Sequence, residues 1–72
     1  MNWRDRISID PRIHHGKPCI KGTRVPVSVI VGSIAEGETP ERIIESWPQL
    51  TPDDIKAALK FAAEMVGDAG LV

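Results

Sequence analysis

Cysteine is almost absent from this sequence of 72 residues, and long apolar runs are lacking altogether. The single cysteine, Cys19, excludes an intramolecular disulfide. No stretch approaches the roughly 18 apolar residues that a membrane-spanning helix needs, and no leader-like apolar segment follows Met1. We therefore expect a protein of the reducing cytoplasm with no membrane partner.

Repeats, low-complexity tracts and long linkers are also lacking, so a single domain over residues 1–72 is predicted. A domain of this length buries only about 60% of the surface that its unfolded chain exposes. Small domains commonly gain stability from a disulfide, a metal ion or a second subunit. Because the sequence offers neither a disulfide nor a convincing metal site, we expect a homodimer.

Charge is distributed unevenly along the chain, although the net charge is only −1. Residues 1–26 hold six basic and two acidic residues, a balance of +4, whereas residues 27–72 hold three basic and eight acidic residues, a balance of −5. A compact chain of this size could place two poles roughly 20 Å apart, beyond the screening length of about 8 Å at physiological salt. Two separate electrostatic surfaces are one interpretation, and charges interleaved on one surface are the other.

Residues 1–25 are predicted to form a basic β-ribbon. Ile7-Ser8-Ile9 alternates apolar and polar residues as a half-buried strand does, and Asp10-Pro11 ends it. Two further short strands are expected, at Cys19-Ile20 and Thr23-Arg24-Val25.

Residues 26–66 are predicted to form three helices, with residues 67–72 as a short tail. Residues 25–35 fit both a strand and one face of a helix, and Pro26 in a first turn with Gly37 as a cap favours the helix. The next two helices begin at threonine-proline-acid signals, in which threonine caps the helix, proline occupies its first position and the acid faces its positive end.

Apolar residues at helical spacing predict which side of each helix faces the core. The expected core positions are Ile43, Ile44, Trp47, Ile55, Ala58, Leu59, Ala62 and Val66. Trp3 is expected to be exposed or to pack on a partner chain. The predicted fold class is mainly α, with a small N-terminal β-ribbon followed by a three-helix bundle. A short helix, a tight turn and a longer helix give the outline of a helix-turn-helix, which any small trihelical bundle shares.

Nucleic-acid binding, if it occurs, is predicted to rest on the basic N-terminal segment. The last helix begins with Asp53 and Asp54, which repel phosphates, and carries no Asn, Gln or Arg for base contacts. Arg24 stands out between the ribbon and a helix start, where its guanidinium would either pin the fold or hold a phosphate or carboxylate. The candidate DNA-binding residues are Arg4, Arg6, Arg12, Lys17, Lys21, Thr23, Arg24, Gln49 and Lys56.

Catalysis, a metal and a cofactor are not predicted. His14, His15 and Cys19 could supply three zinc ligands, but adjacent histidines point to opposite sides of an extended chain and a fourth ligand at suitable spacing is lacking. Cys19 is better explained as a small buried apolar residue than as a nucleophile. We therefore expect a protein that is not an enzyme and has no small-molecule substrate.

Short motifs follow one another along the chain in a distinctive order: Ile9-Asp10-Pro11, Gly16-Lys17-Pro18, Gly22-Thr23-Arg24-Val25-Pro26-Val27, Pro40-Glu41, Leu50-Thr51, Asp54-Ile55 and Ala57-Ala58-Leu59. From about Ile7 to Met65 this order resembles the domain of unknown function 433 family, and the segment from Gly22 to Val27 is its most specific part. The chain departs from the family pattern at His14-His15, where small residues are more usual.

The resemblance implies a homeodomain-like helix-turn-helix fold and the role of an antitoxin in a type II toxin–antitoxin system. Such a protein binds a cognate toxin, here one similar to PIN-type ribonucleases, and represses its own operon by binding DNA. Two alternatives stay open. One is a protein-interaction module whose helix-turn-helix no longer binds DNA, which the acidic last helix favours. The other is a stand-alone small DNA-binding regulator.

Overall fold

The computed structural model describes residues 2–67 and has the predicted mainly helical fold with a small antiparallel sheet near the N-terminus. Its elements are η1 (Trp3–Arg6), β1 (Ile7–Ser8), η2 (His14–Gly16), β2 (Cys19–Ile20), α1 (Val27–Ala35), α2 (Pro40–Ser46) and α3 (Pro52–Gly67). Gly67, the start of the predicted tail, ends α3, and the rest of that tail lies outside the described residues. Within residues 2–67, the helices are too short or too polar to cross a membrane.

The β-ribbon is shorter than predicted. Ile7 pairs with Ile20 and Ser8 with Cys19 in antiparallel register, whereas Ile9 lies beyond the strand and is 61% exposed. The predicted strand at residues 23–25 is wrong, because a turn at residues 21–23 reverses the chain. In this turn, the Thr23 N–H donates to the Ile20 carbonyl (3.0 Å).

The ambiguous stretch that begins at Val25 is confirmed as a helix, α1, from Val27 onward. Pro26 is extended (φ −67°, ψ 146°) and occupies the N-cap, one position earlier than expected. Gly37 ends the helix as predicted, with a φ of +95° that favours glycine. The Gly37 N–H donates to the Ile34 carbonyl and the Glu38 N–H to the Ser33 carbonyl, each at 3.0 Å, which is the Schellman arrangement.

The two threonine-proline signals are confirmed as helix starts. Thr39 accepts a hydrogen bond from the Arg42 N–H (3.2 Å) at the start of α2. Thr51 accepts one from the Asp54 N–H (3.2 Å) at the start of α3. Residues 47–51 form the tight connection between these helices, so the short helix, turn and longer helix follow in the expected order.

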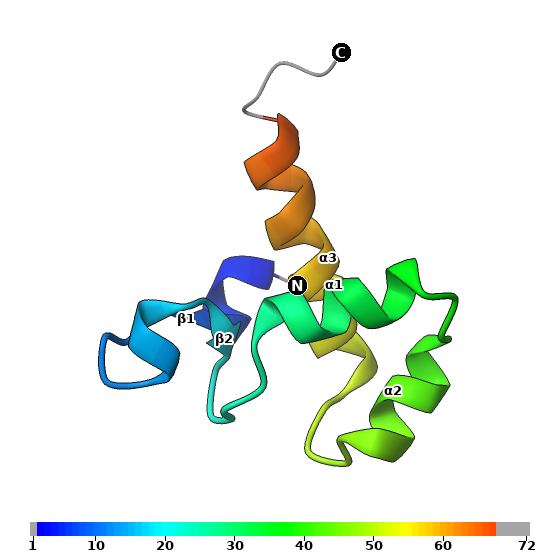
Figure 1. Ribbon diagram of the computed structural model, residues 1–72. Helices are drawn as coiled ribbons and strands as arrows, with labels where there is room; N and C mark the ends of the chain where they lie inside the picture. The colour runs from blue at the N-terminus through cyan, green and yellow to red at the C-terminus, as the bar shows by residue number, and fades with distance from the viewer. Residues whose placement is uncertain (1, 68–72) are drawn as a thin grey trace.

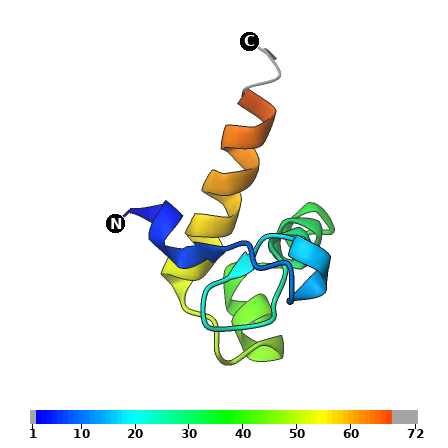
Figure 2. The same ribbon diagram turned by 90° about the vertical axis from the view of Figure 1, so that its left-hand side faces the viewer.

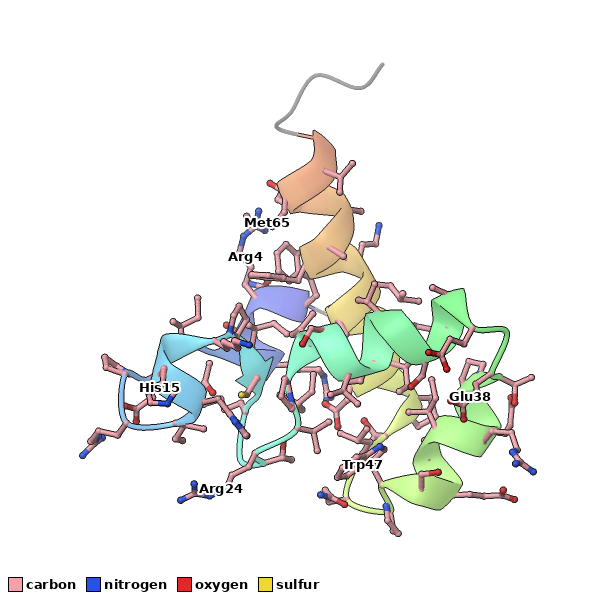
Figure 3. The ribbon with its side chains drawn as sticks, viewed as in Figure 1. Arg4, His15, Arg24, Glu38, Trp47 and Met65 are labelled. Carbon is pink, nitrogen blue, oxygen red and sulfur yellow. The ribbon has the colours of Figure 1, made fainter. Side chains whose placement is uncertain are left out.

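The core lies where α1, α2 and the first half of α3 meet the ribbon. Its buried residues are Ile20, Val25, Val27, Ile30, Ile43, Leu50, Ile55 and Ala58. Of the other expected core residues, Ile44 and Ala62 are half-buried, and three are exposed: Trp47 at 38%, Leu59 at 37% and Val66 at 50%. Trp47 (labelled in Figure 3) follows the last turn of α2 and has non-helical angles (φ −130°, ψ 77°). Its side chain therefore does not continue the apolar row that α2 buries. Leu59 and Val66 lie beyond Ala58, the last buried residue of α3, and Figures 1 and 2 show the C-terminal turns of this helix extending past the other elements.

We expect Ile30→Ala to lower the free energy of unfolding by about 3 kcal/mol, because Ile30 is fully buried and the substitution leaves a cavity. The neighbouring Val29→Ala removes a side chain that is 36% exposed and should cost less than about 1 kcal/mol. Urea denaturation followed by circular dichroism measures both values. Equal decreases in the free energy of unfolding for the two variants would show that α1 does not bury the side that carries Ile30.

Candidate functional site

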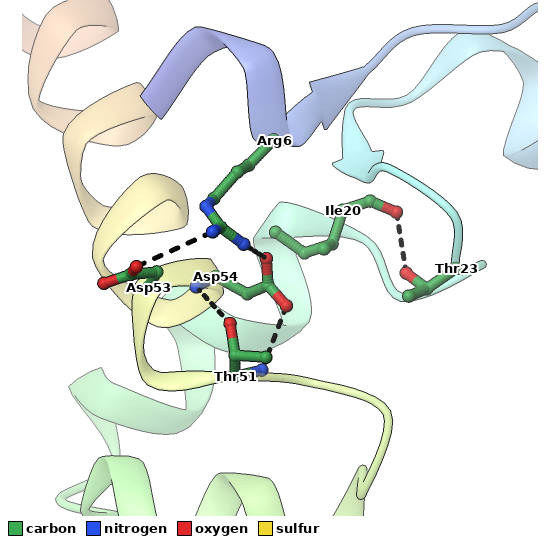
Figure 4. Close-up of polar contacts among 6 residues, drawn as sticks. All are labelled: Arg6, Ile20, Thr23, Thr51, Asp53 and Asp54. Atoms are coloured by element: carbon green, nitrogen blue, oxygen red, sulfur yellow. Dashed lines mark hydrogen bonds and ion pairs between the residues drawn. The ribbon is translucent and has the colours of Figure 1, made fainter. Parts of the chain in front are cut away.

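The N-terminal segment is held against the start of α3 by Arg6. Its Nη1 donates to Asp54 Oδ1 at 3.0 Å, and its Nη2 lies 3.6 Å from Asp53 Oδ2 (Figure 4). Asp54 is only 7% exposed. Its second oxygen accepts from the Thr51 N–H at 3.0 Å, while the Thr51 hydroxyl accepts from the Asp54 N–H. Asp54 therefore closes a capping box and also receives the Arg6 guanidinium.

Two other cations of the predicted basic surface are also engaged by carboxylates of the same chain. Arg4 Nη2 lies 3.2 Å from Glu64 Oε1 on α3. Arg12 donates from Nε and Nη2 to the two oxygens of Asp10, at 3.2 and 3.1 Å. The Arg12 side-chain contact, reinforced by its backbone N–H, lowers the pKa of the Asp10 carboxyl group below its ordinary value.

These pairs correct the interpretation of two separate electrostatic surfaces. The contacts of Arg4 and Arg6 join the basic N-terminal third directly to the acidic remainder, across 60 and 48 positions of the sequence. Charges of both signs also line an open hollow between the two parts, whose walls include Lys21 and Arg6 but also Asp5, Asp53 and Asp54. The charges at this junction are therefore interleaved.

The remaining candidate DNA-binding residues do not all converge. Lys17, Lys21 and Arg24 are exposed, and within residues 2–67 their side chains form no ion pair. Figure 3 shows the Arg24 side chain pointing away from the body. Gln49 lies in the turn before α3 and Lys56 on α3 itself, both exposed.

Thr23 has a structural role in the turn before α1. Its hydroxyl donates to the Ile20 carbonyl at 2.7 Å (Figure 4) and also accepts from the Val25 N–H at 3.1 Å. Both hydrogen-bonding functions of the hydroxyl are thus used within the chain. The Arg24 side chain forms no hydrogen bond or ion pair within residues 2–67, which does not support the prediction that it pins the fold.

His14 and Cys19 contact different backbone carbonyl groups and do not form a common site. His14 Nε2 lies 2.9 Å from the Arg24 carbonyl oxygen, and Cys19 Sγ lies 3.4 Å from the Lys17 carbonyl oxygen. Burial raises the pKa of the Cys19 thiol, which keeps it protonated and a poor nucleophile. His14 and His15 both have left-handed backbone angles, with φ of 48° and 57°. Between residues 2 and 67 no three His, Cys, Asp or Glu side chains gather as metal ligands do.

A surface that the sequence analysis missed runs along both sides of Phe61. On one side, a hollow of about 320 Å³ is lined mainly by apolar residues, namely Pro18, Val27, Val31, Phe61 and Ala62, with Lys17 and Ser28 at its rim. On the other side, a second hollow is lined by Trp3, Ile7, Ile9, Phe61 and Met65, with Arg4 and Glu64 at its rim. We call the two hollows together the Phe61 groove.

The Phe61 groove is formed by segments that are distant in sequence. The Trp3 ring meets the Phe61 ring edge-on, with 6.1 Å between centroids. Arg4 covers the Trp3 ring, its guanidinium carbon 4.6 Å from the centroid. Two of the apolar residues in the groove remain well exposed, Ile9 at 61% and Met65 at 55%. The sequence signal for this surface is the long apolar stripe of α3, which continues past the residues that α1 and α2 cover.

Comparisons with known proteins identify relatives over most of the chain. The model of a family described as protein of unknown function (DUF433) matches residues 7–62. The uncharacterized protein y4eO of Sinorhizobium fredii is 39% identical over 59 residues, which are 82% of this chain but 27% of that protein. The crystal structure of a DUF433 member from Anabaena variabilis superposes with a TM-score of 0.79 at 27% identity, covering 92% of this chain and 64% of the other. This chain therefore spans about a quarter of the curated relative and less than two thirds of the solved one.

We expect Asp54→Asn to lower the free energy of unfolding by about 1–2 kcal/mol, because it removes the charge that Arg6 meets in a nearly buried place. Asp53→Asn should cost less than about 0.5 kcal/mol, since its contact with Arg6 is longer and half-exposed. Urea denaturation of the two variants at pH 7 tests the difference. A cost for Asp53→Asn as large as that for Asp54→Asn would contradict the assignment.

Proposed function

The chain belongs to the DUF433 family, and we propose that it acts as an antitoxin-type binding protein whose Phe61 groove holds a cognate partner protein in the cytoplasm. The proposal rests chiefly on the exposed apolar lining of that groove. Adjoining apolar side chains that line a concave surface are a common feature of protein interaction sites. Aromatic residues, methionine and arginine, which surround Phe61, are enriched in protein interfaces.

The shape and rim of the groove indicate what kind of segment it takes. A concave apolar surface suits an inserted amphipathic helix or apolar loop, as in helix-in-groove recognition. Lys17, which lines one hollow and forms no ion pair within residues 2–67, favours a segment with an acidic residue at that end, whereas Arg4 at the other hollow is paired with Glu64. This chemistry fits a small toxin with clustered acidic residues, and the antitoxin role itself comes from the family resemblance.

The proposal includes no catalytic step. The thiol of Cys19, a potential nucleophile, is buried in the ribbon. The buried carboxylate of Asp54 already accepts hydrogen bonds from Thr51 and Arg6. Among the residues that line the Phe61 groove, Glu64 is the one with a carboxylate, and it pairs with Arg4. This distribution favours binding over chemistry.

We expect Met65→Lys to abolish growth rescue when the protein is co-expressed with the toxic product of the adjacent reading frame. The substitution places a charge in the Phe61 groove, and losing one central apolar contact should weaken binding at least about tenfold. The matched control is Val29→Lys, which changes another exposed apolar residue on a helix but lies outside the groove. Rescue by Met65→Lys at the level of the unchanged protein would reject the groove as the toxin-binding surface.

DNA binding is the second candidate function, and the cations outside the ion pairs favour it. Lys17, Lys21 and Arg24 are exposed on the loops before α1. Exposed cations of this kind suit phosphate contacts, which position a protein on DNA without reading its sequence. With Arg4, Arg6 and Arg12 already paired, the surface offers fewer cations than the sequence suggests, so we place DNA binding second.

We expect Arg24→Ala to weaken the gel shift of the protein's own upstream DNA without changing its thermal midpoint. Its side chain is exposed, so removing it should cost less than about 0.5 kcal/mol of stability. Loss of one phosphate contact should also reduce the slope of log affinity against log salt by about 1. The absence of any shift at low salt with the unchanged protein would eliminate this second function.

A further inference from the structure

Trp3 fills part of the Phe61 groove with a side chain of the same chain. Its ring meets the Phe61 ring edge-on, with 6.1 Å between centroids, and both residues line the second hollow together with Met65. The sequence left two places open for Trp3, exposed or packed on a partner chain, whereas in the structure it is half-buried against its own α3. Figures 1 and 2 show η1, which carries Trp3, beside α3. An aromatic side chain therefore already occupies this part of the groove.

The residues beneath Trp3 are held by the core. Phe61 and Ile7, which line the second hollow with Trp3, both pack against the buried core residues. Ile7 is also fixed by its pairing with Ile20 in the ribbon. Because these residues do not depend on Trp3 for their positions, they would stay in place if its ring left. A hollow able to accept another ring would then open beside Phe61.

Two contacts of Trp3 are of a kind that any aromatic ring can make. One is the edge-on contact with Phe61. The other is with Arg4, whose guanidinium carbon lies 4.6 Å from the centroid of the Trp3 ring. Arg4 has a second partner in Glu64, at 3.2 Å, so it does not depend on Trp3 alone for its position. An aliphatic side chain could fill the same space but would lack both contacts with the ring.

The Trp3 side chain can leave α3 without disturbing the rest of the N-terminal segment. None of the residues of η1 is buried. The segment is anchored at its other end by Arg6, which donates to the nearly buried Asp54 and whose carbonyl accepts from the Lys21 N–H at 2.8 Å. Displacement of Trp3 therefore leaves the ribbon and the start of α3 as they are.

We propose that Trp3 occupies the place of a partner residue: an aromatic side chain of the cognate protein displaces Trp3 from the second hollow and packs on Phe61 in its stead. This inference rests on the proposed function for the identity of the partner, and adds the residue type that the groove accepts. It also makes the Trp3–Phe61 contact autoinhibitory. While Trp3 is in place, the apparent affinity for an aromatic ligand falls in proportion to the fraction of molecules with a free hollow.

The first test needs no partner protein. We expect N-acetyl-tryptophanamide to bind the Trp3→Ala variant of the full chain with a Kd on the order of 1 mM, as a small ligand in a single hollow should. The NMR signals of Ile7 and Met65 should shift on binding. The unchanged chain should bind the probe at least about tenfold more weakly, because its own Trp3 competes. Trp47→Ala is the matched control, since it removes the other tryptophan, which lies outside the groove, and should behave as the unchanged chain does.

A second probe and two double variants test the chemistry of the hollow. N-acetyl-leucinamide should bind Trp3→Ala at least about fivefold more weakly than the tryptophan probe, because it lacks the contacts specific to an aromatic ring. Adding Met65→Lys to Trp3→Ala should abolish binding of the tryptophan probe, whereas adding Val29→Lys, outside the groove, should not. Circular dichroism verifies that the variants keep their helices.

Two results of these probe experiments would overturn the proposal. One is a folded Trp3→Ala variant that binds the tryptophan probe no better than the unchanged chain does. The other is equal affinity of Trp3→Ala for the two probes, which would show that the hollow does not select an aromatic ring.

The final test uses the purified product of the adjacent reading frame. We expect Trp3→Ala to bind it at least about threefold more tightly than the unchanged chain does, and Trp47→Ala to bind it equally well. Equal or weaker binding by Trp3→Ala would overturn the displacement, since Trp3 would then be a bystander or a direct contact. Absence of binding by every variant and by the unchanged chain would instead reject the toxin as the ligand, and the probe experiments decide independently whether the hollow accepts an aromatic ring.

Discussion

The contact between Arg6 and Asp54 is the interaction on which the placement of the N-terminal third depends. Asp54 belongs to the first turn of α3, where it already closes the capping box with Thr51. A carboxylate this deeply buried needs more than one partner, and Arg6 supplies the second. Fixing Arg6 fixes the elements on either side of it: η1, which brings Trp3 onto Phe61, and β1, which pairs with β2. The N-terminal segment is thus joined to α3 by ionic and aromatic contacts, in a chain whose single cysteine cannot form an intramolecular disulfide.

This arrangement changes what the charges of the chain can do. The sequence places most cations in the first third, but Arg4 and Arg6 meet acids of α3 and Arg12 meets Asp10. A guanidinium held by a carboxylate is less available to a phosphate, so the basic surface is smaller than the count of cations suggests. The same contacts bring the N-terminal segment beside α3 and so complete the Phe61 groove. Electrostatic attraction within the chain therefore reduces the number of cations available to phosphates while it helps to form the apolar Phe61 groove.

The helices could be predicted from sequence because their signals are local. Threonine before proline marks the starts of α2 and α3, and Gly37 marks the end of α1 through its positive φ. The candidate site could not be predicted in the same way. Its contacts join residues 48 and 60 positions apart, and nothing in the local pattern says which acid Arg6 will meet. The apolar stripe of α3 was predicted correctly as a periodic pattern. The inference from apolar to buried was wrong for Val66, because periodicity does not reveal how far the neighbouring helices extend.

The length of α3 relative to the body explains how one small domain leaves apolar helical surface exposed beyond its core. Its 16 residues span about 24 Å, while its buried residues end at Ala58. A free helical segment of two turns would be largely unfolded in water, because nucleation is costly. Here the capping box and the burial of Ile55 supply the nucleus, so the projecting turns continue a helix that already exists. A partner then meets a formed surface and loses little affinity to ordering it. The stability of the start of α3, which Arg6 and Asp54 set, therefore also sets how well its far half can bind.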